Sequence, residues 1–219
     1  RRGVNSEVRD GIRAGLPFAV AAVLLGISFG ILARPVMGSA GAIVMSTIVF
    51  AGASQFAAVA VLAAGGGAAA AIVAGILLNT RFLPMGIAIA PSLPGGSLKR
   101  AAQGQALVDA SWAVASLGGG RFDHRRLLGA TLPQYPGWVL GTVLGVVFGD
   151  LLGDPDKLGL DAIFPAFFLA LLVTEMRDRR SATVALLGAA TALALIPLVP
   201  AGLPVVAASL VALLGLRRP

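Results

Sequence analysis

Uncharged polar side chains interrupt an apolar stretch near residue 54. The run Phe-Ala-Gly-Ala-Ser-Gln-Phe over 50–56 places a glycine between small residues and follows it with a hydroxyl and an amide. Such a run can open a helix, and the amide groups and carbonyls freed there can bind the charged ends of a zwitterion. The candidate substrate-binding residues are therefore Gly52, Ala53, Ser54 and Gln55. Alternatively, Ser54 bonds its own helix and Gln55 joins two spans.

Two opposite charges lie within apolar segments further along the chain. Arg81 follows Asn79 and Thr80, and Asp109 lies in the next apolar segment. An arginine inside a span costs about 2.5–3.5 kcal/mol on insertion scales, so it should face a wet cavity or an acidic partner unless it snorkels to an interface. We predict that Asn79 and Arg81 bind substrate. Asp109 either carries the coupled proton or serves only as a counter-ion for Arg81.

Three further polar residues are weaker candidates for the lining of a cavity. Gln134 and Tyr135 lie between two prolines, a pattern equally typical of a kinked helix at the membrane interface. Glu175 precedes several arginines. The alternative to a cavity-lining role is that it is an acid at the membrane interface, paired with these arginines in solvent. The single histidine, His124, is expected in a solvated loop.

Enzyme chemistry is not expected from this sequence. It contains no cysteine and no serine–histidine, paired-aspartate, metal-ligand or phosphate-loop constellation. We therefore expect no catalytic site, no metal and no cofactor. The net charge of +7 is spread over short loops between apolar runs, and this pattern does not fit a nucleic-acid-binding face.

The elements that must position these residues are membrane helices. Hydrophobic residues make up 57% of the chain and charged residues 12%, whereas a soluble domain carries about 25% charged residues. The fold class is all-α, a polytopic membrane protein with a single membrane domain over 1–219. Because a crossing needs about 20 apolar residues, we predict eight spans, near 14–33, 41–64, 68–90, 104–118, 127–149, 162–176, 181–198 and 203–216. The alternative is seven crossings with a re-entrant segment.

The distribution of lysine and arginine predicts the orientation. Cytoplasmic loops are enriched in both residues, and with eight spans the outer loops would hold only Arg34, Lys99, Arg100 and Lys157. We therefore expect both termini in the cytoplasm and the acidic 150–161 loop outside. The chain begins with arginine, so we expect its natural N-terminus to precede residue 1.

A weak internal echo suggests a duplication. The segment Gly-Ile-Ser-Phe-Gly at 26–30 is repeated as Gly-Val-Val-Phe-Gly at 145–149, and Leu-Pro at 16–17 as Leu-Pro at 132–133. Spans 1–4 and 5–8 would then form parallel halves, 1–118 and 119–219, with the substrate between them. Chance similarity in a Gly/Ala/Leu-rich sequence is the alternative. The same glycines have small-xxx-small spacing, which predicts close helix packing.

These motifs together resemble a known family. The segments Gly-Leu-Pro-Phe at 15–18, Gly-Ile-Ser-Phe-Gly at 26–30 and Phe-Ala-Gly-Ala-Ser-Gln-Phe at 50–56, with Asn-Thr-Arg at 79–81 and Asp109, resemble the AzlC-type large subunit of branched-chain amino acid exporters. The resemblance implies a bacterial inner-membrane exporter of small neutral amino acids. It also implies a small AzlD-type membrane subunit as partner and coupling to the proton gradient. Pro84 departs from the family pattern and puts the local shape of its span in doubt.

We therefore expect a secondary-active exporter of branched-chain or other small neutral amino acids. The alternatives are a channel or facilitator for a small neutral solute and a non-transporting assembly subunit. Counterflow separates them, because unlabelled valine inside should accelerate uptake of labelled valine only through a carrier.

Overall fold

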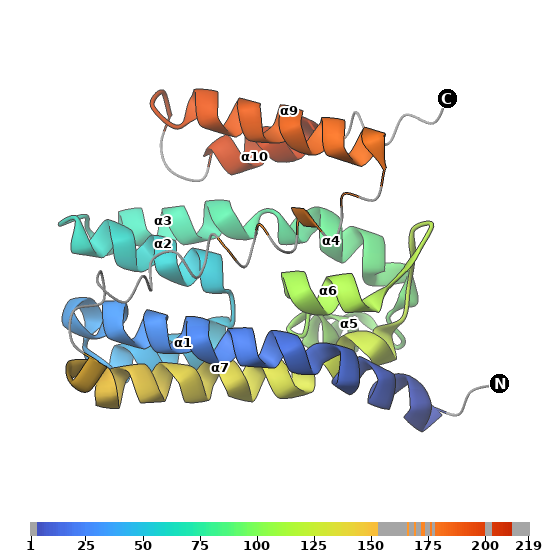
Figure 1. The fold of residues 1–219 in the computed structure, drawn as a ribbon, viewed down its shortest axis with the longest axis horizontal. Helices are drawn as coiled ribbons and strands as arrows, with labels where there is room; N and C mark the ends of the chain where they lie inside the picture. The colour runs from blue at the N-terminus through green and yellow to red at the C-terminus, as the bar shows by residue number, and fades with distance from the viewer. Residues whose placement is uncertain are drawn as a thin grey trace.

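The computed structural model describes residues 4–152, 178–199 and 203–211, together with a few single positions between 166 and 176. Over these residues the chain is almost entirely helical, as predicted (Figure 1). Two helical stretches among them, Ser6–Val49 and Ala68–Ser92, are long and apolar enough to cross a membrane.

The first helix, α1 (Val4–Val49), folds back on itself at Gly38. The backbone there is left-handed, with φ 75° and ψ 166°, a conformation that glycine adopts without a steric penalty. Gly30 and Ser46 consequently meet the same residue of a later helix. The Ser46 hydroxyl lies 2.8 Å from that of Thr142, and a Cβ built on Gly30 would lie 2.3 Å from the Thr142 carbonyl oxygen. Along a straight helix the two positions would be about 24 Å apart.

The chain reverses a second time between α1 and α2 (Gly52–Ala63). Gln55 Nε2 donates to Ser46 Oγ over 3.2 Å, a contact that requires the 39–49 helix and α2 to lie antiparallel. The single crossing predicted over 41–64 is therefore wrong. The segment enters the molecule, turns at Phe50 and Ala51, and leaves by the way it came.

The next helices, α3 (Ala68–Asn79) and α4 (Phe82–Ile89), follow one another with a tight turn at Thr80 and Arg81, and the short helix η1 (Ala90–Ser92) ends the run. Proline has no N–H to complete the helical bond to the carbonyl four residues earlier. The Thr80 carbonyl instead accepts from Leu83 N over 3.0 Å. Pro84 thus explains the local interruption of a span predicted over 68–90.

The predicted crossing over 104–118 is not a continuous helix. The chain forms α5 (Ser97–Gly104), an irregular 105–108 segment and α6 (Asp109–Ala115), then a hairpin of β1 (Ser116–Gly118) and β2 (Arg121–Phe122). With seven residues, α6 is only about 10 Å long and cannot span a bilayer core of about 30 Å. Figure 1 shows this region gathered at the end of the molecule where the N-terminus lies.

The helix α7 (His124–Leu152) packs in parallel against α1, and glycines line the contact. A Cβ on Gly26 would meet the Trp138 carbonyl oxygen at 2.5 Å, and one on Gly145 would meet the Ile27 carbonyl oxygen at 2.2 Å. The predicted close packing through small residues is confirmed. Ion pairs close both ends of the helix pair, Arg125 with Glu7 at 2.7 Å and Arg34 with Asp150 at 2.7 Å.

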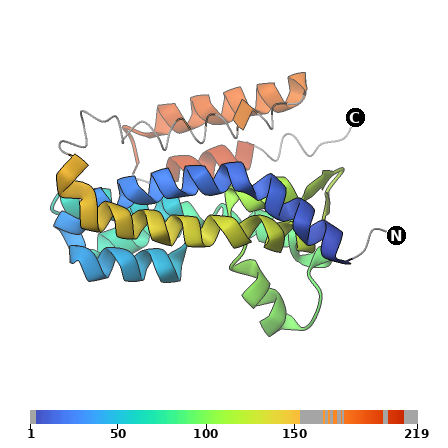
Figure 2. The ribbon, with the colours of Figure 1, turned by 60° about the horizontal axis from the view of Figure 1, so that its bottom comes forward.

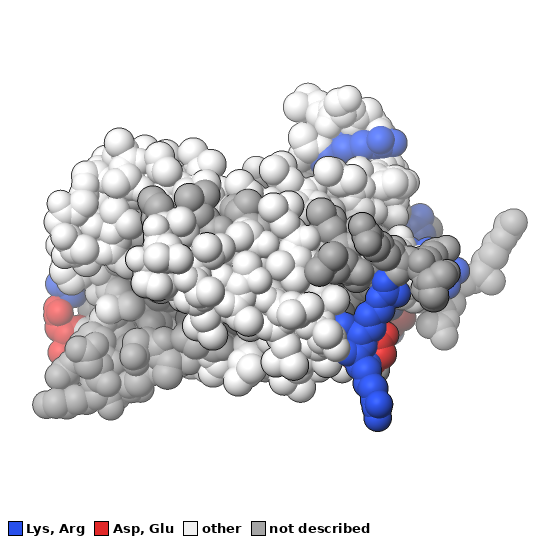
Figure 3. Space-filling model, turned by 90° about the horizontal axis from the view of Figure 1, so that it is seen from above, with Lys and Arg blue, Asp and Glu red and all other residues white. Residues whose placement is uncertain are grey.

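The start of α1, the end of α4 and the start of α7 lie at one end of the molecule. Leu93, which follows η1, packs in one apolar cluster with Leu127 of α7. The helix α5, which carries Lys99 and Arg100, therefore lies at the N-terminal end, which corrects the prediction that placed these residues opposite. The reason is that the segments predicted as spans 2 and 4 do not cross. Figure 3 shows charged residues at the two ends of the visible face and an uncharged band between them.

Two further helices, α9 (Arg179–Leu195) and α10 (Leu203–Val211), pack against each other. They lie on the side of α3 away from α1 and α7 (Figures 1 and 2). The carboxylate of Asp178 accepts from Ser181 N over 2.6 Å and caps the start of α9. This bond lowers the pKa of Asp178, which is fully exposed.

Candidate functional site

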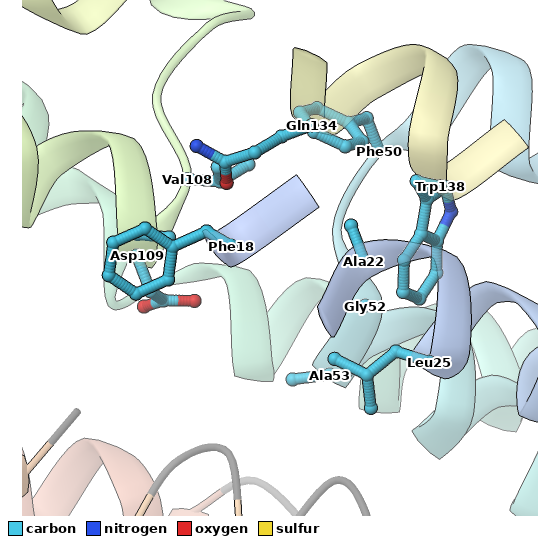
Figure 4. Close-up of a pocket in the computed structure, with 11 residues that line it drawn as sticks. Phe18, Ala22, Leu25, Phe50, Gly52, Ala53, Val108, Asp109, Gln134 and Trp138 are labelled. Atoms are coloured by element: carbon cyan, nitrogen blue, oxygen red, sulfur yellow. The ribbon is translucent and has the colours of Figure 1, made fainter. Parts of the chain in front are cut away.

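A small cavity lies beside α1 and α7, where two interrupted segments meet. The first is 39–63, which breaks at Phe50 and Ala51, and the second is 97–115, in which the irregular 105–108 segment separates α5 from α6. The volume of the cavity is about 60 Å³. The cavity, called the inner cavity below, is lined by Phe18, Ala22, Leu25, Phe50, Gly52, Ala53, Val108, Asp109, Ala110, Gln134 and Trp138 (Figure 4). Four of these, Gly52, Ala53, Asp109 and Gln134, are predicted site residues that the fold brings together from three helices.

Two helices begin at this cavity with the same local pattern. Gly52 and Asp109 are the first residues of α2 and α6, and each is followed by Ala-Ser. Ser54 Oγ donates to the Ala51 carbonyl over 2.9 Å, and Ser111 Oγ donates to the Val108 carbonyl over 3.0 Å. Each serine thus ties its helix to the residue before it. The cavity lies between two helix starts that are built alike.

Gln55 holds the first of these breaks in place. Its side chain is fully buried. Gln55 Oε1 accepts from Ala51 N over 3.2 Å, and Nε2 donates to Ser46 Oγ, which in turn contacts Thr142 of α7. The side-chain amide of Gln55 therefore forms hydrogen bonds on both sides of the break. This agrees with the alternative in which Gln55 joins two spans. It does not line the inner cavity.

Tyr135 stabilises the other side of the same break. Its hydroxyl donates to the Thr47 carbonyl over 2.8 Å, one of the carbonyls left without a helical partner where the 39–49 helix ends. The ring of Tyr135 also packs edge-on against Phe50, with ring centroids 5.1 Å apart. The predicted residue is thus near the site but lines a neighbouring cavity.

The predicted pairing of Arg81 with Asp109 is present. Arg81 Nη2 lies 2.8 Å from Asp109 Oδ2, and the side chains are 19% and 24% exposed. The pair joins the turn between α3 and α4 to the start of α6. Asn79, from the end of α3, contacts Ser54 Oγ through its Oδ1 at 2.9 Å. Asp109 lines the inner cavity, whereas Arg81 is not among its lining residues.

Gln134 supplies an amide at the cavity wall. The side chain is 3% exposed, and its Nε2 donates to the Ala130 carbonyl over 2.8 Å. Within the described part of the chain, no hydrogen bond to Gln134 Oε1 is found. Figure 4 shows its side-chain amide beside Val108. Gln134 thus offers a hydrogen-bond acceptor at the wall of the inner cavity.

Two larger cavities adjoin the inner cavity. One, of about 820 Å³, has a mostly apolar lining and is called the apolar cavity; it is lined by Thr47, Ile48, Phe50, Gln105, Ala106, Leu128, Thr131, Leu132, Tyr135 and Pro136. The other, of about 330 Å³, is called the polar cavity; it is lined by Ile48, Val49, Phe50, Ala51, Asn79, Phe82, Ala101, Gly104, Gln105 and Leu107. Both are bordered by the two interrupted segments.

Sequence reasoning missed the apolar wall of the inner cavity. Phe18, Leu25 and Trp138 lie in membrane helices, where the sequence does not distinguish apolar residues that face a cavity from those that face lipid or another helix. The repeated Ala-Ser after Gly52 and Asp109 was the available signal for the paired helix starts. Glu175 lies outside the described residues.

Comparison with known proteins gives a family match over most of the chain. Residues 17–152 match the family described as AzlC protein. An "Uncharacterized membrane protein" of Archaeoglobus fulgidus is 33% identical over 193 residues, which cover 87% of this chain and 85% of the relative. "Inner membrane protein YgaZ" of Escherichia coli strain K12 is 28% identical over 201 residues, which cover 84% of this chain and 80% of the relative. No solved structure matches significantly.

Proposed function

Because the chain belongs to the AzlC family, whose matched relatives are named as membrane proteins, we propose that it is a secondary-active amino acid exporter. Its substrates are branched-chain or other small neutral amino acids, and its driving force is the proton gradient. It works in a bacterial inner membrane as the large subunit of a permease, beside a small AzlD-type subunit.

The inner cavity is the observation that supports this proposal. A helix start carries about half a positive charge and presents free N–H groups, so the first amides of α2, at Gly52 and Ala53, suit a carboxylate. The carboxylate of Asp109 and the free oxygen of Gln134 suit an ammonium group. Leu25, on the wall of the same cavity, suits an aliphatic side chain. The site would thus recognise both ends of a zwitterion and its apolar part.

Substrate binding requires the site to expand. Ligand sites usually enclose about 300–1,000 Å³, whereas the inner cavity encloses about 60 Å³. Both interrupted segments line the cavity where their helices begin, so an outward movement of either one would enlarge it. In this proposal, the structure is a contracted state of the transport cycle.

The charge distribution supports a cytoplasmic location for the N-terminal end. That end carries Arg125 with Glu7 and the helix α5 with Lys99 and Arg100, whereas Arg34 at the opposite end is paired with Asp150. Lysine and arginine mark the cytoplasmic side. Export would therefore run from the α5–α6 side towards the Arg34–Asp150 side.

Counterflow in proteoliposomes tests the proposal. Vesicles containing the chain and its small partner subunit, loaded with unlabelled valine, should take up labelled valine faster than vesicles loaded with buffer alone. Gly52→Leu should abolish this uptake, because the added side chain enters the inner cavity. Gly67→Leu is the matched control, since a Cβ there meets nothing within 4 Å. Uptake without acceleration would indicate a channel, and no uptake with the partner present would indicate an assembly subunit.

A further inference from the structure

We propose that the ring of Phe50 is the internal barrier that separates the inner cavity from the apolar and polar cavities. The proposal rests on the transport function proposed above and adds the residue that controls access to its site. Phe50 lines all three cavities. Among the described residues, it is the only lining residue that the inner cavity shares with either larger cavity, so it lies at the boundary between them.

The position of Phe50 follows from the fold. It lies at the tip of the interrupted 39–63 segment, opposite the irregular 105–108 segment, whose residues line the same three cavities. The tips approach each other from the two ends of the molecule. In this proposal, the ring of Phe50 between the two tips separates the inner cavity from the larger cavities, and movement of the ring joins them.

The backbone of Phe50 is strained. Its φ is 39°, and among the described residues it is the only non-glycine with positive φ. A bulky side chain in this region is a true outlier, and such strain collects at ligand clamps and switch points, where the surrounding structure enforces it. Here Gln55 and Tyr135 enforce it, because they bond the backbone on either side of Phe50.

The ring of Phe50 contacts both Tyr135 and the apolar cluster behind the inner cavity. It packs edge-on against Tyr135, at an interplanar angle of 87°, and also against the cluster that contains Leu25 and Trp138. The Phe50 side chain is only partly buried. Because Phe50 also lines both larger cavities, a rotation of its side chain has space to move the ring into either one, while the hydrogen bonds of Gln55 and Tyr135 hold the backbone.

Cysteine accessibility tests this barrier without any substrate. The chain contains no cysteine, so a single Ala53→Cys reports on the inner cavity and Gln105→Cys on the larger cavities. Each is combined with Phe50→Gly, which removes the ring and is unstrained at positive φ, and with Phe50→Leu. Phe56→Leu is the matched control, because Phe56 packs on Phe29 and Trp138 and lines none of the three cavities.

We expect the thiol introduced by Ala53→Cys to react with a small charged thiol reagent at least about tenfold faster when Phe50→Gly is present. The reason is that a site reached only in an open fraction reacts in proportion to that fraction. Phe50→Leu should give a smaller rise and Phe56→Leu none, and the thiol introduced by Gln105→Cys should react alike throughout.

Equal rates for the Ala53→Cys thiol with phenylalanine, leucine or glycine at position 50 would overturn the barrier. If Phe50→Gly does not fold, the comparison of Phe50→Leu with Phe56→Leu decides. Valine transport plays no part in the readout, so failure of the transport proposal would be seen separately.

Discussion

Gln55 Nε2 lies 3.2 Å from Ser46 Oγ, so one amide joins the two antiparallel helices on either side of a break. Its Oε1 accepts from Ala51 N, and the side chain is fully buried. This bond network, rather than an apolar contact, fixes where the chain reverses.

Replacing Gln55 with alanine should destabilise the protein. The change strands the Ala51 N–H and the Ser46 hydroxyl, and each buried unsatisfied group costs about 1–3 kcal/mol. Melting of the purified protein in detergent should show a clear drop in Tm. Gln105→Ala is the control, because Gln105 is exposed and should leave the Tm nearly unchanged. Equal Tm values for the two variants would contradict the role given to Gln55.

Gly145→Ala should disrupt the packing of α7 against α1. A Cβ there would lie 2.2 Å from the Ile27 carbonyl oxygen, and because that atom is backbone, a whole helix must shift. Overpacking of this kind costs about 1–3 kcal/mol or more. Gly149→Ala is the control on the same helix, since its Cβ would meet the side chain of Ile31 at 3.0 Å. Membrane abundance and Tm should fall for the first variant and much less for the second.

Sidedness can be measured in the same cysteine-free background. The single substitutions Ser97→Cys and His124→Cys should react from one side of the membrane, and Ser39→Cys from the other. The reason is that α5 and the start of α7 lie at one end and the turn at Gly38 lies at the opposite end. Labelling of the Ser97→Cys and Ser39→Cys proteins from the same side would rule out the arrangement of the interrupted segments.

The sequence predicted helices, close glycine packing and the Arg81–Asp109 pair, because each depends on local composition or on a charge that must be neutralised. The break near Gly52 was also predicted, and the structure places it just earlier, at Phe50 and Ala51. The alternative with a re-entrant segment allowed for one reversal, but the positions of the reversals were not predictable. A segment that turns back inside the protein is as apolar as one that crosses the bilayer, since both avoid water, so 41–64 looks like a full span.

The last prediction separates structure from mechanism at Arg81 and Asp109. Their side chains are 19% and 24% exposed and their charged atoms lie 2.8 Å apart. Removing one partner of a buried pair leaves a stranded charge at a cost of about 3–5 kcal/mol, so each single alanine variant should lose abundance and export. The double variant lacks the stranded charge, and its loss should be smaller than the sum of the single losses.

The pair of Arg34 with Asp150 is the matched control, because its side chains are 38% and 78% exposed and exposed pairs contribute about 0–1 kcal/mol. Arg34→Ala should therefore insert and export almost normally. If Arg81→Ala with Asp109→Ala restores abundance but not valine export, the pair belongs to the transport path, where Asp109 would carry the proton beside the substrate. Normal export by the double variant would reduce both residues to counter-ions. Wild-type export by either single variant would show that the ion pair is not needed at all.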